Sequence, residues 1–337
     1  MSAPSVVIVV SEPLMREFFG DDGSARLHAA AERLHGDLPG PAWERVDALA
    51  DAGNLSECRV LVTSWGTEPL DSAVLGTLPR LGLVAHTGAS IRPFATDALF
   101  DRGVVVTQAG TAMARPVAEV SLAFTLALLH RIPHLHDALR TREDGWSSRG
   151  GQHEILGAPI TVIGASRTGR AYLDMIRALG ARASVVDPTL SADEIRELGA
   201  EPVSLADGLR KAQIVALHAP SLPETRHLIG RAELALMRDG AGLVNTARSW
   251  LVDEAALADE LTSGRLSAAL DVFDEEPLPP GSPFRHLPNV LATPHRAAGT
   301  VEGRRRQGRI VADELSAFAT GEPLRHTVSR EQLAVMA

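Results

Sequence analysis

Short apolar runs rich in Val, Ile, Leu and Ala recur along the chain and alternate with longer stretches whose apolar residues return at helical spacing. Runs of this kind are typical of strands buried on both faces of a parallel sheet. Expected strands are residues 6–10, 59–63, 83–85, 104–107, 160–163, 183–186, 214–217, 242–245, 267–270 and 290–292. Expected helices include residues 25–34, 71–75, 93–102, 115–131, 191–198, 231–237, 253–263 and 300–320. The regular alternation predicts an α/β protein with two Rossmann-like, doubly wound parallel sheets.

Prolines mark the ends of the most apolar expected helix. Pro116 suits the first turn of the helix 115–131, and Pro133 is expected to stop it. A looser segment then leads to residue 156, after which the second half begins. The last helix, 300–320, is long enough to return to the first half.

The clearest local pattern covers residues 159–188, PITVIGASRTGRAYLDMIRALGARASVVDP. A strand leads into a glycine-rich turn, a helix follows and ends at Gly180, and a second strand ends at Asp187. This order resembles the dinucleotide-binding fingerprint G-x-G-x-x-G with an acid about 20 residues further on. Gly164 permits the tight turn, and Gly169 lets the helix pack closely on the sheet. The helix N-terminus offers N–H groups to a pyrophosphate.

Ser166 stands where the fingerprint has its second glycine. A serine fits if its side chain turns away, or its hydroxyl can donate to a phosphate. Asp187 can accept hydrogen bonds from ribose hydroxyls and would repel a 2′-phosphate, which favours NAD over NADP. The alternative is an ordinary strand–helix turn with a surface Asp-Pro. The expected cofactor contacts of this stretch are Gly164, Ser166, Arg167, Thr168 and Asp187.

Composition narrows the class of function. The net charge is −9, and the basic cluster of three arginines at 304–306 is short, so no nucleic-acid partner is expected. The single cysteine, Cys58, forms no disulfide within the chain and fits a reducing cytoplasm. Residues 1–10 lack the features of a signal peptide, and the apolar helix at 117–129 is too short and too interrupted to span a bilayer. We therefore expect a soluble, cytoplasmic protein with no membrane partner.

Side chains suited to catalysis follow three separate expected strands. Arg248 follows 242–245, Asp271 ends 267–270 with Glu276 beyond it, and His295 follows 290–292. Ligands of open parallel sheets bind at the carboxyl ends of strands. An arginine can hold a carboxylate bidentately, and a histidine can transfer a proton near neutral pH, as an acid when a carboxylate is beside it. Taken singly, each also has a plain interpretation, as a surface arginine, an acidic loop and a capping or core histidine.

The other histidines give weaker indications of a functional site. His130, His134 and His136 lie close in sequence, but Pro133 separates them, so no metal site is expected. His218 follows the strand 214–217 and either lines a cofactor site or is structural. The chain has no serine nucleophile elbow and no P-loop motif.

In this order the motifs resemble those of the D-isomer-specific 2-hydroxyacid dehydrogenases over nearly the whole chain. The resemblance is carried by the cofactor turn 162–169, Leu-His-Ala-Pro at 217–220 with Glu-Thr at 224–225, Asn-Thr-Ala-Arg at 245–248, Asp-Val-Phe at 271–273 with Glu-Pro at 276–277, and Thr-Pro-His at 293–295. It implies an NAD-dependent oxidoreductase that interconverts a small anionic D-2-hydroxyacid and its 2-oxoacid by hydride transfer.

The same resemblance implies an organisation into domains. An NAD-binding Rossmann domain, residues 113–299, would be inserted in a flavodoxin-like substrate domain made of residues 1–112 and 300–337. The two domains would close over NAD, and a homodimer would form through the cofactor domain and the helix 116–131.

The resemblance also implies roles for single residues. His295 would protonate the carbonyl oxygen as hydride arrives, or take the proton in reverse, and Glu276 would pair with it. Arg248 would bind the substrate carboxylate and polarise the carbonyl. Asp271 would face the nicotinamide carboxamide. Further contacts are expected from His218, Pro220, Thr225 and Thr246 for the cofactor, and from Thr87, Gly88, Ala89 and Arg92 for the substrate.

Some positions depart from the family pattern. Ser166 and Ser249 replace glycines, and the usual Asp-Asn run after residue 88 is absent. The side chains of His86, Arg92, Arg296 and Arg304 can add positive charge near the substrate. This suggests a substrate with a second anionic group, such as a phosphate, a phosphonate or a second carboxylate. The alternative is that the arginines pair with surface acids.

Two other functions remain open. One is a catalytically idle NAD-sensing protein, which the family's corepressor members resemble. The other is a formate or phosphite type of dehydrogenase on the same scaffold. The presence of Arg248, Glu276 and His295 together favours the 2-hydroxyacid enzyme.

Overall fold

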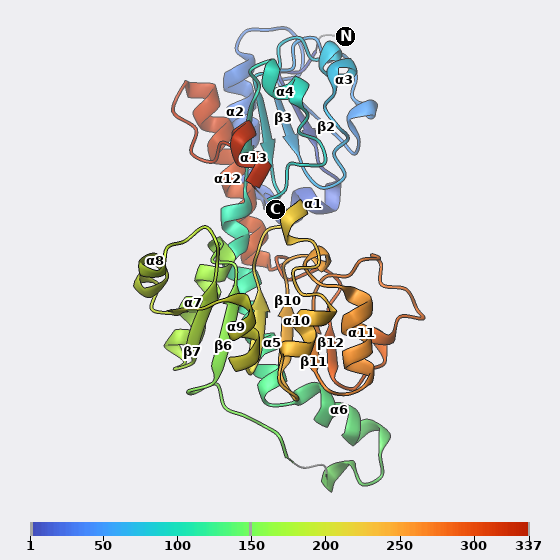
Figure 1. The fold of residues 1–337 in the computed structure, drawn as a ribbon. Coiled ribbons are helices and arrows are strands. Elements are labelled where there is room, and N and C mark those ends of the chain that lie inside the picture. Colours follow the sequence, from blue (N-terminus) through green and yellow to red (C-terminus); the bar gives the residue numbers. More distant parts are fainter. Residues whose placement is uncertain (1–2, 148–149, 336–337) are drawn as a thin grey trace. The chain divides into compact units, whose positions relative to one another are not determined.

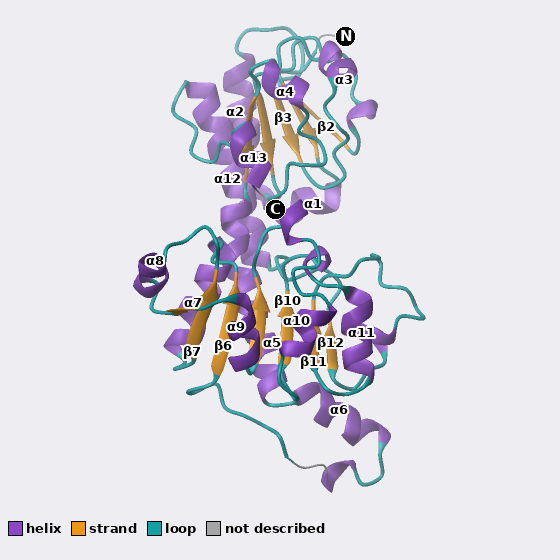
Figure 2. Ribbon diagram, in the orientation of Figure 1, coloured by secondary structure: helices purple, strands orange, loops and turns teal. Residues whose placement is uncertain are grey.

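The computed structural model describes residues 3–147 and 150–335. Residues 1–2 and 336–337, the outer ends of the expected substrate domain, lie outside the described residues. The chain divides into two compact units, Met1–Met113 with Gly299–Ala337 (unit 1) and Ala114–Ala298 (unit 2). Each unit contains a parallel sheet with helices on its faces (Figures 1 and 2). The predicted α/β class with two doubly wound parallel sheets is confirmed.

Unit 1 is built on a sheet of strand order β2-β1-β3-β4-β5. Its strands are β1 (Val6–Val9), β2 (Trp43–Val46), β3 (Val60–Thr63), β4 (Leu83–His86) and β5 (Val105–Gln108), and all pair in parallel. Val6 and Ile8 pack with the helices α2 (Gly20–His35) and α12 (Val301–Thr320), whereas Val7 and Val9 belong to the core on the opposite face. This alternation shows why apolar runs without polar gaps form the central strands.

The remaining elements of unit 1 are short. They are α1 (Glu12–Phe18), η1 (Leu49–Asp51), α3 (Ser72–Thr77), α4 (Asp97–Asp101), η2 (Gly110–Met113) and α13 (Arg330–Val335). Strand β2 and helix α1 were not predicted. The sequence of β2, Trp-Glu-Arg-Val, mixes polar and apolar residues because β2 is the edge strand of the sheet.

Unit 2 contains a sheet of order β12-β11-β10-β9-β6-β7-β8. Its strands are β6 (Pro159–Ile163), β7 (Arg182–Val186), β8 (Glu201–Pro202), β9 (Ile214–Leu217), β10 (Gly242–Asn245), β11 (Ser267–Leu270) and β12 (Val290–Ala292). Its helices are α5 (Ala114–Leu129), α6 (Ile132–Thr141), α7 (Arg167–Ala178), α8 (Ala192–Glu197), α9 (Leu205–Lys211), α10 (Arg231–Leu236) and α11 (Glu254–Thr262), with short turns η3 (Gly145–Ser147), η4 (Pro223–Thr225), η5 (Ser249–Leu251) and η6 (Pro283–Arg285). Strand β8 and helix α9 were not predicted.

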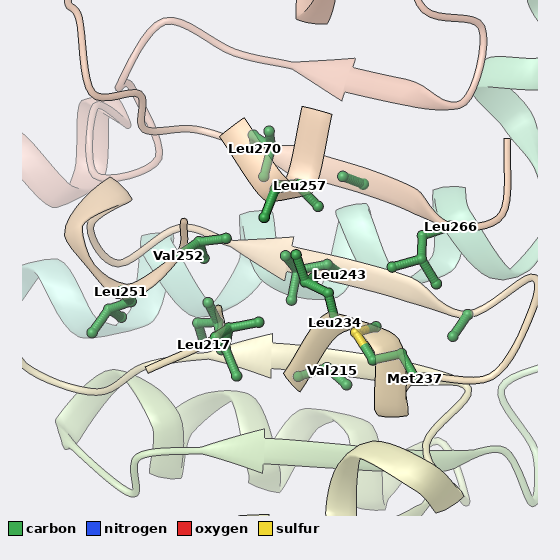
Figure 3. Close-up of a cluster of buried hydrophobic side chains, with 14 of the residues drawn as sticks. Val215, Leu217, Leu234, Met237, Leu243, Leu251, Val252, Leu257, Leu266 and Leu270 are labelled. Atoms are coloured by element: carbon green, nitrogen blue, oxygen red, sulfur yellow. The ribbon is translucent and has the colours of Figure 1, made fainter. Parts of the chain in front are cut away.

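Both faces of this sheet are buried along its central strands β6, β9 and β10. Val215 and Leu217 of β9 point into the core formed with α10 and α11, where Leu243, Leu234 and Met237 gather (Figure 3). The alternate residues of β9, Ile214 and Ala216, belong to the second core, which contains residues of α5 and α7. A sheet buried in this way keeps the carboxyl ends of β10, β11 and β12 side by side, and the candidate catalytic residues follow these ends (Figure 1).

The segment after α5 differs from the expectation. The helix ends at Leu129, Arg131 adopts a left-handed conformation with φ 53°, and Pro133 lies in the first turn of α6. Pro133 therefore starts a helix where it was expected only to stop one. The stretch Gly110–Leu129 is long and apolar enough to cross a membrane by length and composition, and half of it is buried in the structure. Core helices of soluble proteins have the same properties.

Candidate active site

The turn after β6 requires both of its glycines. Gly164 has φ 93°, and a Cβ added there would lie 2.5 Å from the Ala219 nitrogen. A Cβ added at Gly169 would lie 2.1 Å from the Gly164 carbonyl oxygen. Such distances are far inside van der Waals contact. The chain therefore passes close to its neighbours here, as a turn that cradles a pyrophosphate must.

Ser166 is the N-cap of α7. Its Oγ accepts a hydrogen bond from the Gly169 N–H at 3.3 Å. The side chain thus turns toward the helix, which gives a physical reason for serine at the second glycine position of the fingerprint. The next residues, Arg167 and Thr168, form the first turn of α7, with Arg167 exposed and Thr168 half-buried.

Asp187 follows β7 and stabilises the glycine-rich turn after β6 by a hydrogen bond. Its Oδ2 accepts from the Ala165 N–H at 2.7 Å, and its Oδ1 accepts from the Thr189 N–H and hydroxyl at 2.9 and 2.6 Å. The residue is half-buried. The carboxylate therefore sits beside the glycine turn, where ribose hydroxyls are bound in dinucleotide sites.

His218 has a buried side chain beneath the turn. Its ring lies 5.0 Å from that of Tyr172, and burial lowers its pKa to about 3, so the imidazole is neutral. These contacts are those of a buried structural residue, and a contact of His218 with the cofactor stays a prediction. Thr225 donates to the Pro220 carbonyl at 2.7 Å and closes the loop after β9. Thr246, after β10, lies 2.7 Å from the Ser121 hydroxyl of α5.

Changing Gly169 to alanine is expected to weaken NADH binding by about tenfold or more, because the new Cβ would push α7 away from the turn. NADH fluorescence titration measures this. Gly281→Ala is the matched control, since a Cβ at Gly281 meets nothing within 4 Å. An unchanged NADH dissociation constant in Gly169→Ala would show that the turn does not hold the cofactor.

The structure brings His295 and Glu276 together. The His295 Nδ1 lies 2.8 Å from the Glu276 Oε2, and the Phe273 N–H donates to the other carboxylate oxygen at 3.0 Å. The two side chains remain 47% and 37% exposed, so the pair is open to a ligand. His295 has φ 51°, a left-handed conformation that is uncommon for a histidine. Strain of this kind is found more often at functional sites than elsewhere.

Asp271 holds the loop that carries His295. It is buried, and its carboxylate accepts hydrogen bonds from the Thr293 hydroxyl and from the N–H groups of Arg296 and Ala297, the last two at 2.9 and 2.8 Å. These bonds fix the backbone on both sides of His295. Sequence reasoning missed Thr293 as the partner of Asp271, although Thr-Pro-His marks the segment. A contact of Asp271 with nicotinamide stays a prediction.

Arg248 follows β10 in a loop shaped by Asn245. The Asn245 amide donates to the Arg248 carbonyl at 2.9 Å and accepts from the Ala247 N–H at 3.0 Å. Burial lowers the pKa of the Arg248 guanidinium, and the negative charge of Glu276 opposes this shift. The guanidinium therefore lies in the electrostatic neighbourhood of the pair formed by His295 and Glu276.

In unit 1, the expected substrate loop follows β4. Within residues 3–147 and 150–335, the N–H groups of Gly88 and Ala89 donate to no protein acceptor. Two adjacent free N–H groups are suited to bind an anion. A Cβ at Gly88 would lie 2.6 Å from His86 Nε2, so a side chain there would press on the buried His86 ring. Thr87 is buried, and Arg92 is exposed.

Two of the four expected cations do not provide a free charge. Burial lowers the pKa of His86 to about 4, and its Nδ1 lies 3.0 Å from the Thr63 hydroxyl. His86 is therefore neutral, and the expectation that it adds positive charge is wrong. Arg304 is buried beside Trp65 and Phe18, with Glu17 at 3.6 Å. Arg92 and Arg296 are exposed.

Comparisons with known proteins point to one protein family. A family model described as D-isomer specific 2-hydroxyacid dehydrogenase, NAD binding domain, matches residues 122–297. The chain is 39% identical over 254 residues to the D-3-phosphoglycerate dehydrogenase of Mycobacterium tuberculosis, a match that covers 75% of this chain and 48% of that protein. The chain thus spans about half the length of this relative. It is 35% identical over 277 residues to the glyoxylate reductase of Aeropyrum pernix, covering 80% and 82%.

Solved structures show the same likeness. The 2-hydroxyacid dehydrogenase of Ketogulonicigenium vulgare matches with a TM-score of 0.78 and 25% identity, covering 98% of this chain and 99% of that one.

Proposed function

The chain belongs to the family of D-isomer specific 2-hydroxyacid dehydrogenases, which use NAD, and we propose that it interconverts a D-2-hydroxyacid and its 2-oxoacid with His295 as general acid and base. The observation that carries the proposal is the contact between His295 Nδ1 and Glu276 Oε2 at 2.8 Å. The negative charge of Glu276 also acts on the Arg248 guanidinium, whose pKa it raises against the effect of burial. These residues follow β12, β11 and β10, which are neighbours in one sheet.

The residues present fit NAD. A side chain at Gly164 or Gly169 would fill the space of the turn, and α7 begins with a capped N-terminus. Gly164, Ser166, Arg167, Thr168 and Asp187 would hold the pyrophosphate and ribose. The loops at Pro220, Thr225, Thr246 and the buried Asp271 would shape the nicotinamide side, with His218 supporting the turn from below. When bound, the cofactor supplies or accepts the hydride at C2 of the acid.

His295 and Glu276 together carry out the proposed proton transfer. The Glu276 carboxylate accepts from Nδ1 of His295, which leaves Nε2 to donate to the carbonyl oxygen of a 2-oxoacid or to accept from the hydroxyl of a 2-hydroxyacid. Because Glu276 is itself held by the Phe273 N–H, it orients the ring as well as stabilising its charged form. Asp271 fixes the loop on which His295 lies.

Two groups are proposed as carboxylate binders, each within its own unit: the Arg248 guanidinium in unit 2, and the N–H groups of Gly88 and Ala89 in unit 1, whose loop Thr87 supports. The guanidinium would also polarise the carbonyl that is reduced. A second anionic group on the substrate stays a prediction, and neither His86, which is neutral, nor Arg304, which contacts aromatic rings and Glu17, would supply a free charge for it.

We also propose a cytoplasmic homodimer. Large apolar side chains of the segment after α5 are exposed in unit 2, with Trp146 at 88% and Leu139 at 57%. Exposed apolar surface of this kind favours a partner of the same chain. The single, buried Cys58 is compatible with a reducing compartment. Sedimentation equilibrium measures the state of assembly, and a monomer at micromolar concentration would contradict the dimer.

The function is tested with a panel of 2-oxoacids and D-2-hydroxyacids in both directions, with NADH and NADPH compared. We expect turnover of at least one acid, with preference for NADH because of Asp187. Binding of NADH without turnover of any acid would instead indicate an NAD-sensing protein. Reduction of NAD by formate or phosphite alone would indicate the third function.

A further inference from the structure

A small cavity opens at the carboxyl edge of the unit 1 sheet, where β1 lies between β2 and β3. Its volume is about 90 Å³. The chain order reverses at β1, and such switch points are where open parallel sheets bind ligands. None of the residues that line this cavity was predicted as a site residue. The nearest predicted residues belong to the loop after β4.

The lining of the cavity is chemically distinct. Aliphatic groups come from Val9, Val10, Leu14 and Leu49, and an indole comes from Trp65. The only charged lining residues are acids. Asp47 is bonded to Arg45 at 2.8 Å, whereas Glu68 is exposed and has no cationic partner among the described residues. Ser11, Ser64 and Thr67 also line the cavity, which therefore favours an uncharged group over an anion.

Trp65 is held in place by two neighbours. Its ring stacks on that of Phe18 at 5.5 Å, and the Arg304 guanidinium lies 4.3 Å from its centroid. Arg304 also lies 5.2 Å from the Phe18 ring. A cation over an aromatic face is attracted by the ring, more strongly where water is excluded, and Arg304 is only 8% exposed. The indole nevertheless keeps 47% of its surface open.

Helix α12, which carries Arg304, also fixes the expected substrate loop after β4. Gln307, one turn after Arg304 on α12, is buried and donates to the Thr87 carbonyl at 3.0 Å. The Thr87 hydroxyl donates to the Ser64 hydroxyl at 3.0 Å, and Ser64 lines the cavity. The Trp65 Nε1 lies 3.4 Å from where a Cβ would stand on Gly88. The cavity and the loop with the free N–H groups are therefore direct neighbours, with Trp65 at their boundary.

We propose that this cavity receives the side chain of the substrate, and that Trp65, positioned by Arg304, restricts the enzyme to 2-oxoacids with a short, uncharged side chain. This inference rests on the proposed function, because the loop at Gly88 and Ala89 must hold the carboxylate of the same molecule. A cavity of about 150 Å³ accepts benzene, so the smaller volume here suits a chain of a few carbon atoms rather than a ring.

The test is kcat/KM along a series of acids: pyruvate, 2-oxobutanoate, 2-oxopentanoate, phenylpyruvate and the doubly anionic 2-oxoglutarate. The wild type is expected to prefer 2-oxobutanoate or 2-oxopentanoate over 2-oxoglutarate by about tenfold or more. In Trp65→Ala, the value for 2-oxobutanoate should fall by about tenfold through KM, while phenylpyruvate gains relative to it. Glu68→Lys should improve 2-oxoglutarate relative to 2-oxobutanoate.

Arg304 is tested as a positioning residue. Arg304→Met should change the ranking of the acids in the same direction as Trp65→Ala, and Arg304→Lys should restore part of it, because the cation returns without its planar face. Leu38→Ala, the truncation of another exposed apolar side chain of unit 1 that does not line the cavity, should leave the ranking unchanged. NADH titration and thermal unfolding of each variant show whether the fold is kept.

Calorimetric titration of the same acids into the NAD-loaded protein separates this inference from the proposed function. If no acid is turned over but 2-oxobutanoate binds and Trp65→Ala weakens it, the function fails and the cavity assignment stands. The assignment is overturned if 2-oxoglutarate is preferred, if Trp65→Ala lowers all acids equally, or if no acid binds.

Discussion

Replacing His295 with asparagine is expected to lower kcat for a 2-oxoacid by about 10³-fold, within the range that general acid–base catalysis contributes. Asparagine tolerates the left-handed conformation at φ 51°, so the backbone of the loop should be kept. Its amide can still donate to Glu276, but nothing replaces the Nε2 proton. The dissociation constant of NADH should change little, because His295 is not part of the glycine turn.

The control for this variant is His286→Asn. His286 is an exposed histidine after η6 in the same unit, and the same chemical change there should leave kcat within about twofold, as surface substitutions usually do. Single-turnover kinetics with saturating NADH measure the chemical step in both variants. Equal rates in His295→Asn and His286→Asn would remove His295 from the mechanism.

Replacing Arg248 with glutamine is expected to lower kcat/KM by about 10³-fold, because Arg248 is half-buried and truncating one partner of a charged hydrogen bond costs about 2–5 kcal/mol or more. KM should rise and kcat should fall, since the guanidinium is proposed to bind the carboxylate and to polarise the carbonyl. Arg248→Lys should recover only part of the loss, because an ammonium cannot bind a carboxylate bidentately. Initial-rate kinetics across substrate concentration measure both parameters.

Arg196→Gln provides the control for charge. Arg196 is an exposed residue of α8 paired with Asp193, so its loss should change kcat/KM by less than about twofold. If Arg248→Gln kept its KM and lost only kcat, the carboxylate would bind elsewhere and Arg248 would serve the carbonyl alone.

Much of unit 2 could be predicted because its signals are local. The strands β9, β10, β11 and β12 have the predicted bounds, since each is a short, mainly apolar run bracketed by turn residues. The left-handed Gly180 after α7 was predicted by the same kind of local rule. The residues that follow these strands then had to meet at one edge of the sheet, and the His295–Glu276 contact has that origin.

Other features depend on tertiary contacts that no local pattern contains. Strand β2 is defined by its pairing with β1, not by an apolar run. His86 loses its charge only because the fold buries it, and Arg304 is drawn to the rings of Trp65 and Phe18, which lie far from it in sequence. Ser166 shows the converse, because a departure from the fingerprint becomes an ordinary N-cap once the helix start is known.

The central claim is that Arg248, Glu276 and His295 direct hydride from NADH to C2 of a 2-oxoacid. Its most direct test is single turnover with NADH deuterated at the transferred position, followed by analysis of the product. The account predicts deuterium at C2 of a hydroxyacid of D configuration, formed by the wild type and about 10³-fold more slowly by His295→Asn. A product of L configuration, or oxidation of NADH without label at C2, would contradict it.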